Sequence, residues 1–288
     1  MMLGKTIQIY LPFGSPRGIK IAEITNRTVQ AILIPRNLLE KAGEREEVKS
    51  VGVYYLFGQD EDEAKTQLYV GEAENCYDRL KQHNREKDFW EVAIVFVTNN
   101  SQNQFTKTDA KFLESHSYDV ADKISRYRLK QSIPASSFVP EWRKSDLFDI
   151  FETIKILTST LGYPIFDELR DGHQKNNNDN LFYCKGRGIQ AVAEYTEEGM
   201  VVLKNSEMAR DTTESFKEYM TSSGMRRDTL IKDGIVKLTG DVYTFQEDYI
   251  FTSPSAAAKT VLGRAANGWT KWKTKDGKTL DQIKRKGK

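Results

Sequence analysis

Residues 51–73 read VGVYYLFGQDEDEAKTQLYVGEA, and this stretch decides the fold that the sequence predicts. It holds two runs of β-branched and aromatic residues, Val51–Phe57 and Gln67–Gly71, which are typical of strands. The segment between them, Gln59–Glu63, is polar and acidic, so we expect an exposed loop. The stretch therefore predicts two neighbouring strands joined by an acidic loop.

The residues after these strands predict a helix, a third strand and a second helix. Asn75 suits the N-cap position of a helix that runs to about His83, because its side chain can accept a hydrogen bond from the first turn. Val92–Val97 is a continuous apolar run, which favours a buried strand. Thr106 or Thr108 can cap the second helix. The order strand, strand, helix, strand, helix is typical of one small mixed unit.

Short strands are expected before this unit, and an amphipathic helix is expected after it. Thr6–Tyr10 and Gly18–Ala22 alternate between apolar and polar residues, and Val29–Ile34 is a third apolar run. A proline-containing linker, Ser132–Pro140, follows the unit. Beyond it, apolar residues of Leu147–Leu161 recur at spacings of three and four, which predicts a helix with one apolar face.

A second pattern of short strands begins at Leu181, after the polar segment Asp171–Asn180, which we expect to be a flexible loop. Thr213–Ser222 is expected to be helical. Another helix is expected over Ser253–Gly263, with serine at the N-cap, proline at the first helical position and glycine at the end.

These patterns predict an α+β fold in four parts. The parts are a β-rich N-terminal extension (1–48), a small mixed sheet flanked by helices (49–131), a linker with the amphipathic helix (132–180), and a second small α+β domain with a basic tail (181–288).

Composition limits the classes of function. The chain has 288 residues, of which 39% are hydrophobic and 29% charged. No run approaches the roughly 18 consecutive apolar residues that a spanning helix needs, so no membrane partner is expected.

The two cysteines, Cys76 and Cys184, are too few for a disulfide scaffold or a four-cysteine zinc site, and they favour the cytoplasm. Net charge is only +2, but Lys271–Lys288 holds eight basic and two acidic residues, which suits phosphate contacts or a solvated tail.

One carboxylate in the small mixed unit suits a metal-dependent reaction at phosphate. Phosphodiester hydrolysis needs an activated water, neutralised phosphoryl oxygens and a stabilised leaving oxygen, and a cation can meet two of these needs. Glu114 is the candidate ligand for one ion, Mg²⁺ or Mn²⁺, since a hard cation held by one carboxylate keeps most of its waters. Its helical neighbours Ala110, Ser117 and Ala121 are small, which predicts a low face that a phosphate can approach.

Arg79 and His83 are four residues apart, so one helix presents both on one face. The Arg79 guanidinium can donate to two phosphate oxygens. A free phenol has a pKa of about 10, so a phenolate at pH 7 costs about 4 kcal/mol. Tyr54 is therefore a general base only if Arg79, His83 or the metal lowers that cost. Otherwise Tyr54 or Tyr69 relays a proton or orients the water.

Taken singly, these residues also fit structural roles, such as core tyrosines and a surface arginine. Taken together, the stretch from about Ser50 to Leu129 resembles the GIY-YIG endonuclease family. The two motifs appear as Gly52-Val53-Tyr54 and Tyr69-Val70-Gly71. The candidate catalytic residues that match the family are Tyr54, Tyr69, Arg79, His83 and Glu114. The resemblance implies a single-metal DNA endonuclease whose active face consists of the motif strands and the Arg79 helix.

The chain departs from the family pattern in three places. Valine replaces isoleucine in both motifs, and the segment between them is slightly long. The asparagine that the family often carries late in the domain has no clear match, and Gln131 or Lys130 stands near that place.

Leu181–Asp281 resembles a domain of unnamed function, DUF4357, that is often fused to GIY-YIG modules in bacterial proteins. The segments that carry this resemblance are Ser253–Ala258, Gly263-Arg264 and Asn267-Gly268-Trp269 with Trp272. Basic residues interleave with the tryptophans, which fits nucleic-acid contact. The candidates are Arg264, Lys271, Lys273 and Lys275. The same pattern fits a hairpin with buried tryptophans and a solvated basic face.

The sequence supports three hypotheses of function. The first is a metal-dependent endonuclease acting on double-stranded DNA, in bacterial DNA defence, restriction or repair. The alternative is a non-catalytic DNA-binding reader that uses the C-terminal domain. The third is an RNA-processing enzyme, for which we identify no specific motif.

Overall fold

The computed structural model describes residues 4–60, 63–99, 103–170, 181–214, 216 and 222–285, with side chains from 225 onward in the last segment. Contacts divide the chain into two compact units, residues 1–61 with 65–167 and residues 62–64 with 168–288. Both units mix helices and strands, so the expected α+β class is confirmed. The expected loop Asp171–Asn180, the middle of the acidic loop and most of the helix expected over Thr213–Ser222 lie outside the described residues.

The first unit is built on one seven-stranded sheet, in the order β1-β2-β3-β6-β4-β5-β7. Its strands are β1 (Ile7–Tyr10), β2 (Lys20–Ile24), β3 (Val29–Pro35), β4 (Gly52–Gly58), β5 (Gln67–Ala73), β6 (Val92–Thr98) and β7 (Arg128–Leu129). Neighbours are antiparallel, except that β7 runs parallel to β5. Since β3 pairs with β6 along its whole length, the strands before residue 48 belong to the same sheet as the two motif strands.

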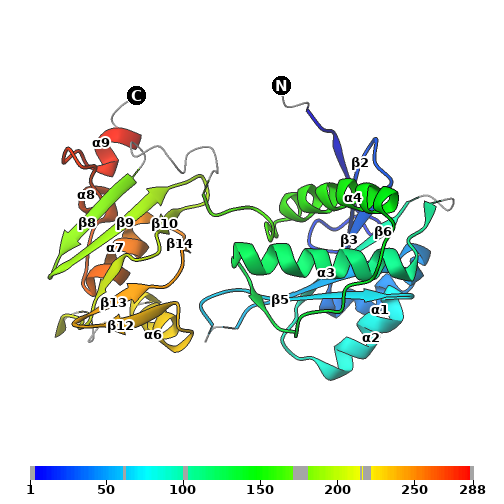
Figure 1. Cartoon of the computed structure of the whole chain (residues 1–288), viewed down its shortest axis with the longest axis horizontal. Coiled ribbons are helices and arrows are strands. Elements are labelled where there is room, and N and C mark those ends of the chain that lie inside the picture. Colours follow the sequence, from blue (N-terminus) through cyan, green and yellow to red (C-terminus); the bar gives the residue numbers. More distant parts are fainter. Residues whose placement is uncertain are drawn as a thin grey trace. The chain divides into compact units, whose positions relative to one another are not determined.

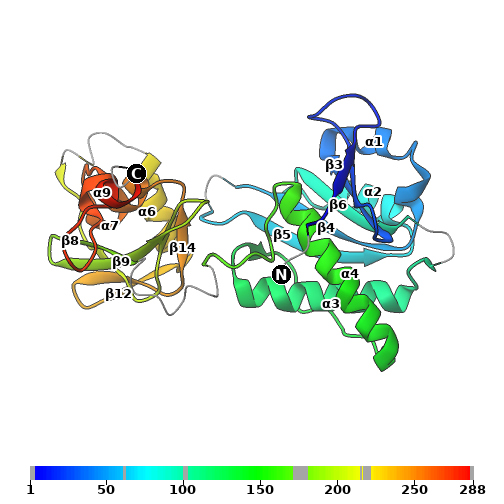
Figure 2. The same cartoon turned by 90° about the horizontal axis from the view of Figure 1, so that it is seen from above.

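Helices cover both faces of this sheet, as Figures 1 and 2 show: α3 and α4 lie on one face, and α1 and α2 on the other. The helical elements are η1 (Arg36–Leu38), α1 (Leu39–Ala42), η2 (Glu46–Lys49), α2 (Cys76–Glu86), α3 (Lys107–Ile124) and α4 (Glu141–Thr160). Tyr55 packs in the apolar cluster on the α3 side, and Tyr54 packs in the cluster on the α2 side. Consecutive strand residues point to opposite faces, so these adjacent tyrosines serve different cores.

The predicted N-caps fix where α2 and α3 begin. Asn75 Oδ1 accepts a hydrogen bond of 3.1 Å from the backbone N–H of Asp78. Thr106 and Asp109 form a capping box, because the side chain of each accepts from the backbone N–H of the other. Asp109 also accepts two hydrogen bonds from Arg143, at 3.0 and 2.9 Å, which attaches α4 to α3.

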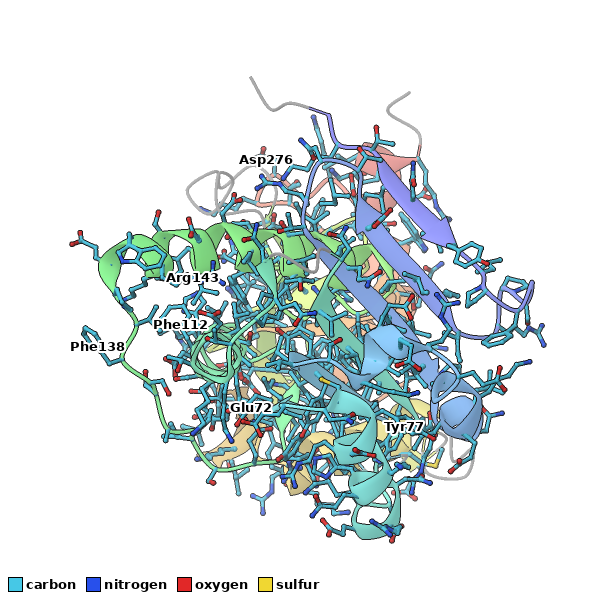
Figure 3. All side chains as sticks on the ribbon, turned by 90° about the vertical axis from the view of Figure 1, so that its right-hand side faces the viewer. Glu72, Tyr77, Phe112, Phe138, Arg143 and Asp276 are labelled. Atoms are coloured by element: carbon cyan, nitrogen blue, oxygen red, sulfur yellow. The ribbon has the colours of Figure 1, made fainter. Side chains whose placement is uncertain are left out.

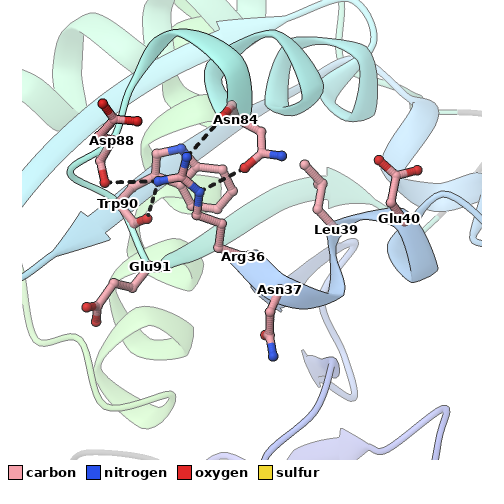
Figure 4. A pocket seen from close by; sticks show the side chains of 8 residues that line it. All are labelled: Arg36, Asn37, Leu39, Glu40, Asn84, Asp88, Trp90 and Glu91. Atoms are coloured by element: carbon pink, nitrogen blue, oxygen red, sulfur yellow. Dashed lines mark hydrogen bonds between the residues drawn. The ribbon is translucent and has the colours of Figure 1, made fainter.

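Arg36, from the residues directly after β3, holds the end of α2 (Figure 4). Its guanidinium donates to the side chain and the carbonyl of Asn84, at 2.8 and 2.9 Å, and to the carbonyls of Asp88 and Trp90, at 2.9 and 3.1 Å. The guanidinium also lies 4.9 Å from the centre of the Trp90 ring, and the indole donates to the carbonyl of His83 at 3.4 Å. The N-terminal part of the chain therefore stabilises the turn of α2 that carries His83.

The second unit holds a four-stranded sheet, β14-β10-β9-β8, and a three-stranded sheet, β11-β13-β12. Its elements are β8 (Leu181–Gly186), β9 (Ile189–Tyr195), β10 (Met200–Val202), β11 (Glu207–Ala209), α6 (Ser222–Lys232), β12 (Val236–Thr239), β13 (Val242–Phe245), β14 (Tyr249–Phe251), α7 (Pro254–Leu262), α8 (Gly268–Lys271) and α9 (Leu280–Lys284). Helix α7 begins and ends as predicted, with Ser253 at the N-cap and Gly263 in the left-handed conformation at φ 59°. No helix in the described ranges of either unit is long and apolar enough to cross a membrane.

Candidate active site

The glycines of the two tripeptides are required by close contacts at the site. A Cβ atom on Gly71 would lie 2.4 Å from the ring and the hydroxyl of Tyr54. A Cβ atom on Gly52 would lie 2.5 Å from the carbonyl oxygen of Phe96 on the neighbouring strand. Both distances are far below van der Waals contact, so neither position accepts a side chain without a shift of its surroundings. Gly71 in particular sets the place of the Tyr54 phenol.

Tyr54, Tyr69 and His83 form one aromatic group on the α2 face of the sheet. The Tyr54 hydroxyl lies 2.8 Å from Nε2 of His83, and both residues are 1% exposed. The two tyrosine rings are stacked with centroids 6.4 Å apart, and the Tyr69 ring meets the imidazole edge-on at 5.1 Å. Tyr69 is only half-buried, so its side of the group is open to solvent.

Arg79 lies one turn before His83 on α2 and interacts with both phenols. Its guanidinium lies near both phenols and favours their ionised forms, and it donates a hydrogen bond of 2.5 Å to Oε1 of Gln82. The structure therefore brings together four of the five side chains that the sequence singled out, through contacts between β4, β5 and α2.

The protonation states in this group follow from burial. Burial raises the pKa of Tyr54 far above its usual value, the neighbouring Tyr69 raises it further, and the nearby Arg79 guanidinium offsets only part of this rise. Burial, with the positive charges of Arg79 and Lys87, lowers the pKa of His83 to about 4. At neutral pH the phenol therefore keeps its proton and the imidazole is neutral.

This pairing suits proton relay rather than a standing phenolate. In the tautomer that leaves Nε2 unprotonated, Tyr54 donates its proton to His83. Nδ1 of His83 is buried and has no hydrogen-bond partner in the described part of the chain. The imidazole can therefore accept the Tyr54 proton when the phenol takes one from a reacting group.

Glu114 lies on α3, and its carboxylate is within electrostatic range of Arg79 and Tyr69. Burial and the negative charge of Glu72 raise the pKa of Glu114 to about 7, against the opposing effects of Lys111 and Arg79. Within the described residues, the Glu114 side chain makes no hydrogen bond and no ion pair. This carboxylate is thus destabilised in its charged form, and Lys111 and Arg79 offset only part of that effect.

The small neighbours of Glu114 do not form the open face that the sequence predicts. Ala110, Ser117 and Ala121 are all buried, and the Ser117 hydroxyl lies 2.7 Å from the hydroxyl of Tyr55. These residues are small because α3 packs closely on the sheet. That expectation was wrong, since helical spacing alone does not say which face of a helix meets the sheet.

Glu72 is a site residue that sequence reasoning missed. It follows directly after the second tripeptide on β5, and Figure 3 shows it between α2 and α3. Its Oε2 atom is buried and has no hydrogen-bond partner among the described residues. The available signal was an acidic residue inside an otherwise apolar strand, immediately after a motif glycine.

A surface pocket of about 360 Å³ opens beside this carboxylate. It is lined by Glu72, Ala73, Glu74, Asn75, Asp78, Arg79, Gln82 and Lys107. Lys107 pairs with Glu74 at 3.2 Å across it. The pocket gives solvent, and a ligand of phosphate size, access to Arg79 and Glu72.

Gln131 does not offer its amide to the site. Its Oε1 accepts a hydrogen bond of 2.7 Å from the backbone N–H of Val70, and its Nε2 donates to the Val70 carbonyl. The side chain thus continues the pairing of β7 with β5 and protects the strand edge.

In the second unit, Lys271 ends the short helix α8, whereas Lys273 and Lys275 lie on a tight antiparallel turn that the pairing of Lys273 with Thr279 closes. Trp272 is buried and donates to the carbonyl of Pro254 at 3.0 Å, and a Cβ atom on Gly268 would lie 2.1 Å from the same carbonyl. The Asn267-Gly268-Trp269 segment therefore docks α8 on the start of α7. Trp269 is half-buried, with the Arg285 guanidinium 3.5 Å from the centre of its ring.

Lys271, Lys273 and Lys275 are exposed, and Arg264 is half-buried. The Nε atom of Arg264 is buried without a hydrogen-bond partner in the described part of the chain. Arg264 and Lys271 both lie near the buried thiol of Cys184, whose pKa is raised to about 11 by burial. Both cysteines are free thiols, as expected.

Residues 182–284 match the domain of unknown function DUF4357. The resemblance that the sequence showed for the C-terminal domain is therefore confirmed for DUF4357. No curated protein and no solved structure matches the chain. The family match covers only part of the second unit, so the GIY-YIG resemblance of the stretch from about Ser50 to Leu129 stays a prediction from its sequence.

Proposed function

We propose that the first unit is a GIY-YIG-type endonuclease that hydrolyses phosphodiester bonds of double-stranded DNA with one divalent cation, Mg²⁺ or Mn²⁺. The observation that carries this proposal is the convergence of Tyr54, Tyr69, Arg79 and His83 on one group, beside the unpaired carboxylate of Glu114. A solvated arginine, a phenol–imidazole pair and an incompletely compensated carboxylate are the parts that phosphodiester hydrolysis needs.

The residues at the site fit a hard cation. The described ranges contain no cluster of three or more histidine, cysteine, aspartate or glutamate side chains arranged to hold a metal. They do contain the buried, unpartnered Oε2 of Glu72 and the destabilised carboxylate of Glu114, which favour a positive charge between them. A cation with few protein ligands keeps most of its waters, as Mg²⁺ does. When bound, it would neutralise charge on the phosphoryl group.

The other side chains of the site bind the phosphate, transfer the proton and orient the reacting group. Arg79 donates to a non-bridging phosphate oxygen from the wall of the pocket. The Tyr54 phenol takes the proton that the attacking water releases, and its own proton passes to Nε2 of His83. The half-buried Tyr69 orients the group that gives up the proton. The substrate excludes water from the open side of the aromatic group.

Cleavage of supercoiled plasmid tests the proposal. We expect Mg²⁺-dependent nicking or linearisation by the full chain, and a loss of about 10²- to 10³-fold in rate for Arg79→Ala and for Glu114→Gln. Arg85→Ala and Asp119→Asn are matched controls, because each removes an exposed charge from the same helix, α2 or α3. Unchanged cleavage by the Arg79→Ala/Glu114→Gln double variant would overturn the proposal.

A second function, sequence-independent DNA binding by the C-terminal domain, is favoured by the unpartnered Arg264 and the exposed lysines. Neutralising one phosphate contact lowers the slope of log affinity against log salt by about one. We expect that change for Arg264→Ala in the full chain, and no change for Lys237→Ala on β12 of the same unit. Equal slopes for both variants would remove the support for this function.

The setting that fits these activities is the cytoplasm of a bacterium, in DNA defence, restriction or repair. Two free buried thiols are typical of proteins kept in a reducing compartment.

A further inference from the structure

Glu72 points to the face of the sheet that α3 covers. Leu68 and Val70 belong to the apolar cluster on the α3 side, and alternation along β5 puts Glu72 on the same face. The strand register pairs Tyr55 with Val70 and, two residues along, Val53 with Glu72.

Helix α3 is attached to the sheet beside Val70, two residues before Glu72 on β5. The Ser117 hydroxyl lies 2.7 Å from the Tyr55 hydroxyl, which fixes one turn of α3 over the Tyr55–Val70 pair. Glu114 lies three residues, one helical turn, before Ser117. Lys107, the first residue of α3, pairs with Glu74, which directly follows β5, so the turns of α3 before Ser117 lie towards the Glu72 end of the strand.

Neither carboxylate has a hydrogen-bond or ion-pair partner among the described residues. The buried Oε2 of Glu72 accepts no hydrogen bond from any described residue. Lys107, the lysine of the adjoining pocket, is paired with Glu74. Lys111 and Arg79 act on Glu114 only through space, since neither bonds to it within the described part of the chain. Two neighbouring unpaired carboxylates in a half-buried place repel each other, which costs stability unless a cation binds.

We propose that Glu72 is a second carboxylate ligand of the divalent cation, so that β5 and α3 hold the ion between them. The assignment rests on the proposed nuclease function, because phosphodiester hydrolysis is what calls for the ion. It makes the ion a link between the second motif strand and the Glu114 helix. Carboxylate oxygens suit Mg²⁺ and Mn²⁺, and two of them leave room for waters and a phosphate oxygen.

Metal affinity without DNA tests this assignment. Mn²⁺ binding to the full chain is measured by titration calorimetry for the wild type, Glu72→Gln, Glu114→Gln and Glu74→Gln. Glu74 is the matched control, because it lines the same pocket two residues further on, is exposed, and already has Lys107 as its partner. We expect at least a roughly tenfold weaker Kd for Glu72→Gln and for Glu114→Gln, and a change within about twofold for Glu74→Gln. Equal affinity of the wild type and Glu72→Gln would overturn the assignment, as would an equal loss in Glu74→Gln.

Thermal unfolding gives a second, independent readout. Without metal, Glu72→Gln should raise Tm, because it removes the repulsion with Glu114. With Mn²⁺ in excess, the increase in Tm that the wild type shows should be largely lost in this variant. If the two carboxylates only share a proton, Glu72→Gln will keep the full Mn²⁺-induced increase, and the assignment fails.

The failure of the assignment and that of the nuclease proposal are distinguishable. A wild type that cleaves plasmid, together with a Glu72→Gln variant that keeps its Mn²⁺ affinity, would refute only the role of Glu72. A wild type that binds Mn²⁺ through Glu72 but cuts no DNA would refute the nuclease proposal and leave the metal site in place.

Discussion

The Tyr54 hydroxyl lies 2.8 Å from Nε2 of His83, in a place where both side chains are 1% exposed. The phenol belongs to the first tripeptide, and the imidazole comes from α2, 29 residues later in the chain. Burial holds the phenol protonated and the imidazole neutral, so the proton of their hydrogen bond rests on the phenol oxygen. This relationship changes the role we assign to Tyr54, from a possible phenolate base to one end of a proton relay.

Removing the Tyr54 hydroxyl should reduce cleavage far more than it reduces stability. Tyr54→Phe keeps the ring but ends the relay, so we expect a loss of about 10²- to 10⁴-fold in cleavage rate. The adjacent Tyr55→Phe is the matched control, since it removes an equally buried hydroxyl that contacts Ser117 on the other face of the sheet. Both variants should lose about 1 kcal/mol in urea unfolding. A similar loss of cleavage in both would argue against the relay.

The lowered pKa of His83 should make the fold sensitive to mild acid. The unfolded chain binds a proton at this residue below pH 6.5, whereas the folded chain binds it only below about 4. The unfolded state therefore binds more protons in this window, and the free energy of unfolding falls as pH falls from 6.5 towards 4, by roughly 2–3 kcal/mol. Urea unfolding across this range should show a shallower pH dependence for His83→Gln than for the wild type. If the free energy of unfolding depends on pH equally in His83→Gln and in the wild type, the lowered pKa of His83 is contradicted.

A single methyl group at Gly71 should displace the Tyr54 phenol. The added Cβ would lie 2.4 Å from the Tyr54 ring, which is buried. We expect Gly71→Ala to lower the free energy of unfolding by about 1–3 kcal/mol and the cleavage rate by about 10²-fold. Gly4→Ala is the control, because nothing lies within 4 Å of the Cβ that it adds. Full activity of the folded Gly71→Ala protein would show that the position of Tyr54 is not critical.

Arg36 should matter for stability although it lies outside the two motifs. Arg36→Ala leaves the carbonyls of Asp88 and Trp90 and the end of α2 without their donor, which should cost about 2–4 kcal/mol in urea unfolding. Arg36→Lys cannot reproduce the planar set of donors and should recover only part of the loss. Arg17→Ala, which removes an exposed arginine of the same unit, should change the free energy of unfolding by less than about 0.5 kcal/mol.

Local chemistry made the helix and strand boundaries of the first unit predictable. Asn75 and Thr106 cap α2 and α3 because the capping hydrogen bond forms within four residues of sequence. The β-branched run from Val92 becomes a strand for an equally local reason. The sequence alone did not reveal that β3 joins the sheet beside β6, because this strand pairing joins residues that are 57 to 69 positions apart.

The residues of the candidate site were also only partly predictable from the sequence. Residue types and spacing sufficed to name Tyr54, Tyr69, Arg79, His83 and Glu114 as one set, since a motif records which chemistry is present. They did not single out Glu72, because its importance comes from α3 packing over β5 and from a carboxylate oxygen that has no donor among the described residues.

By itself, the sequence determined the elements, the two tripeptides and the kinds of groups they carry. Only the tertiary structure decided their states: which tyrosine is buried, which imidazole is neutral and which carboxylates lack a partner. The physical reason is that pKa values and unmet hydrogen bonds depend on burial and on neighbours in space, and alternation along β4 and β5 sends adjacent residues to different cores.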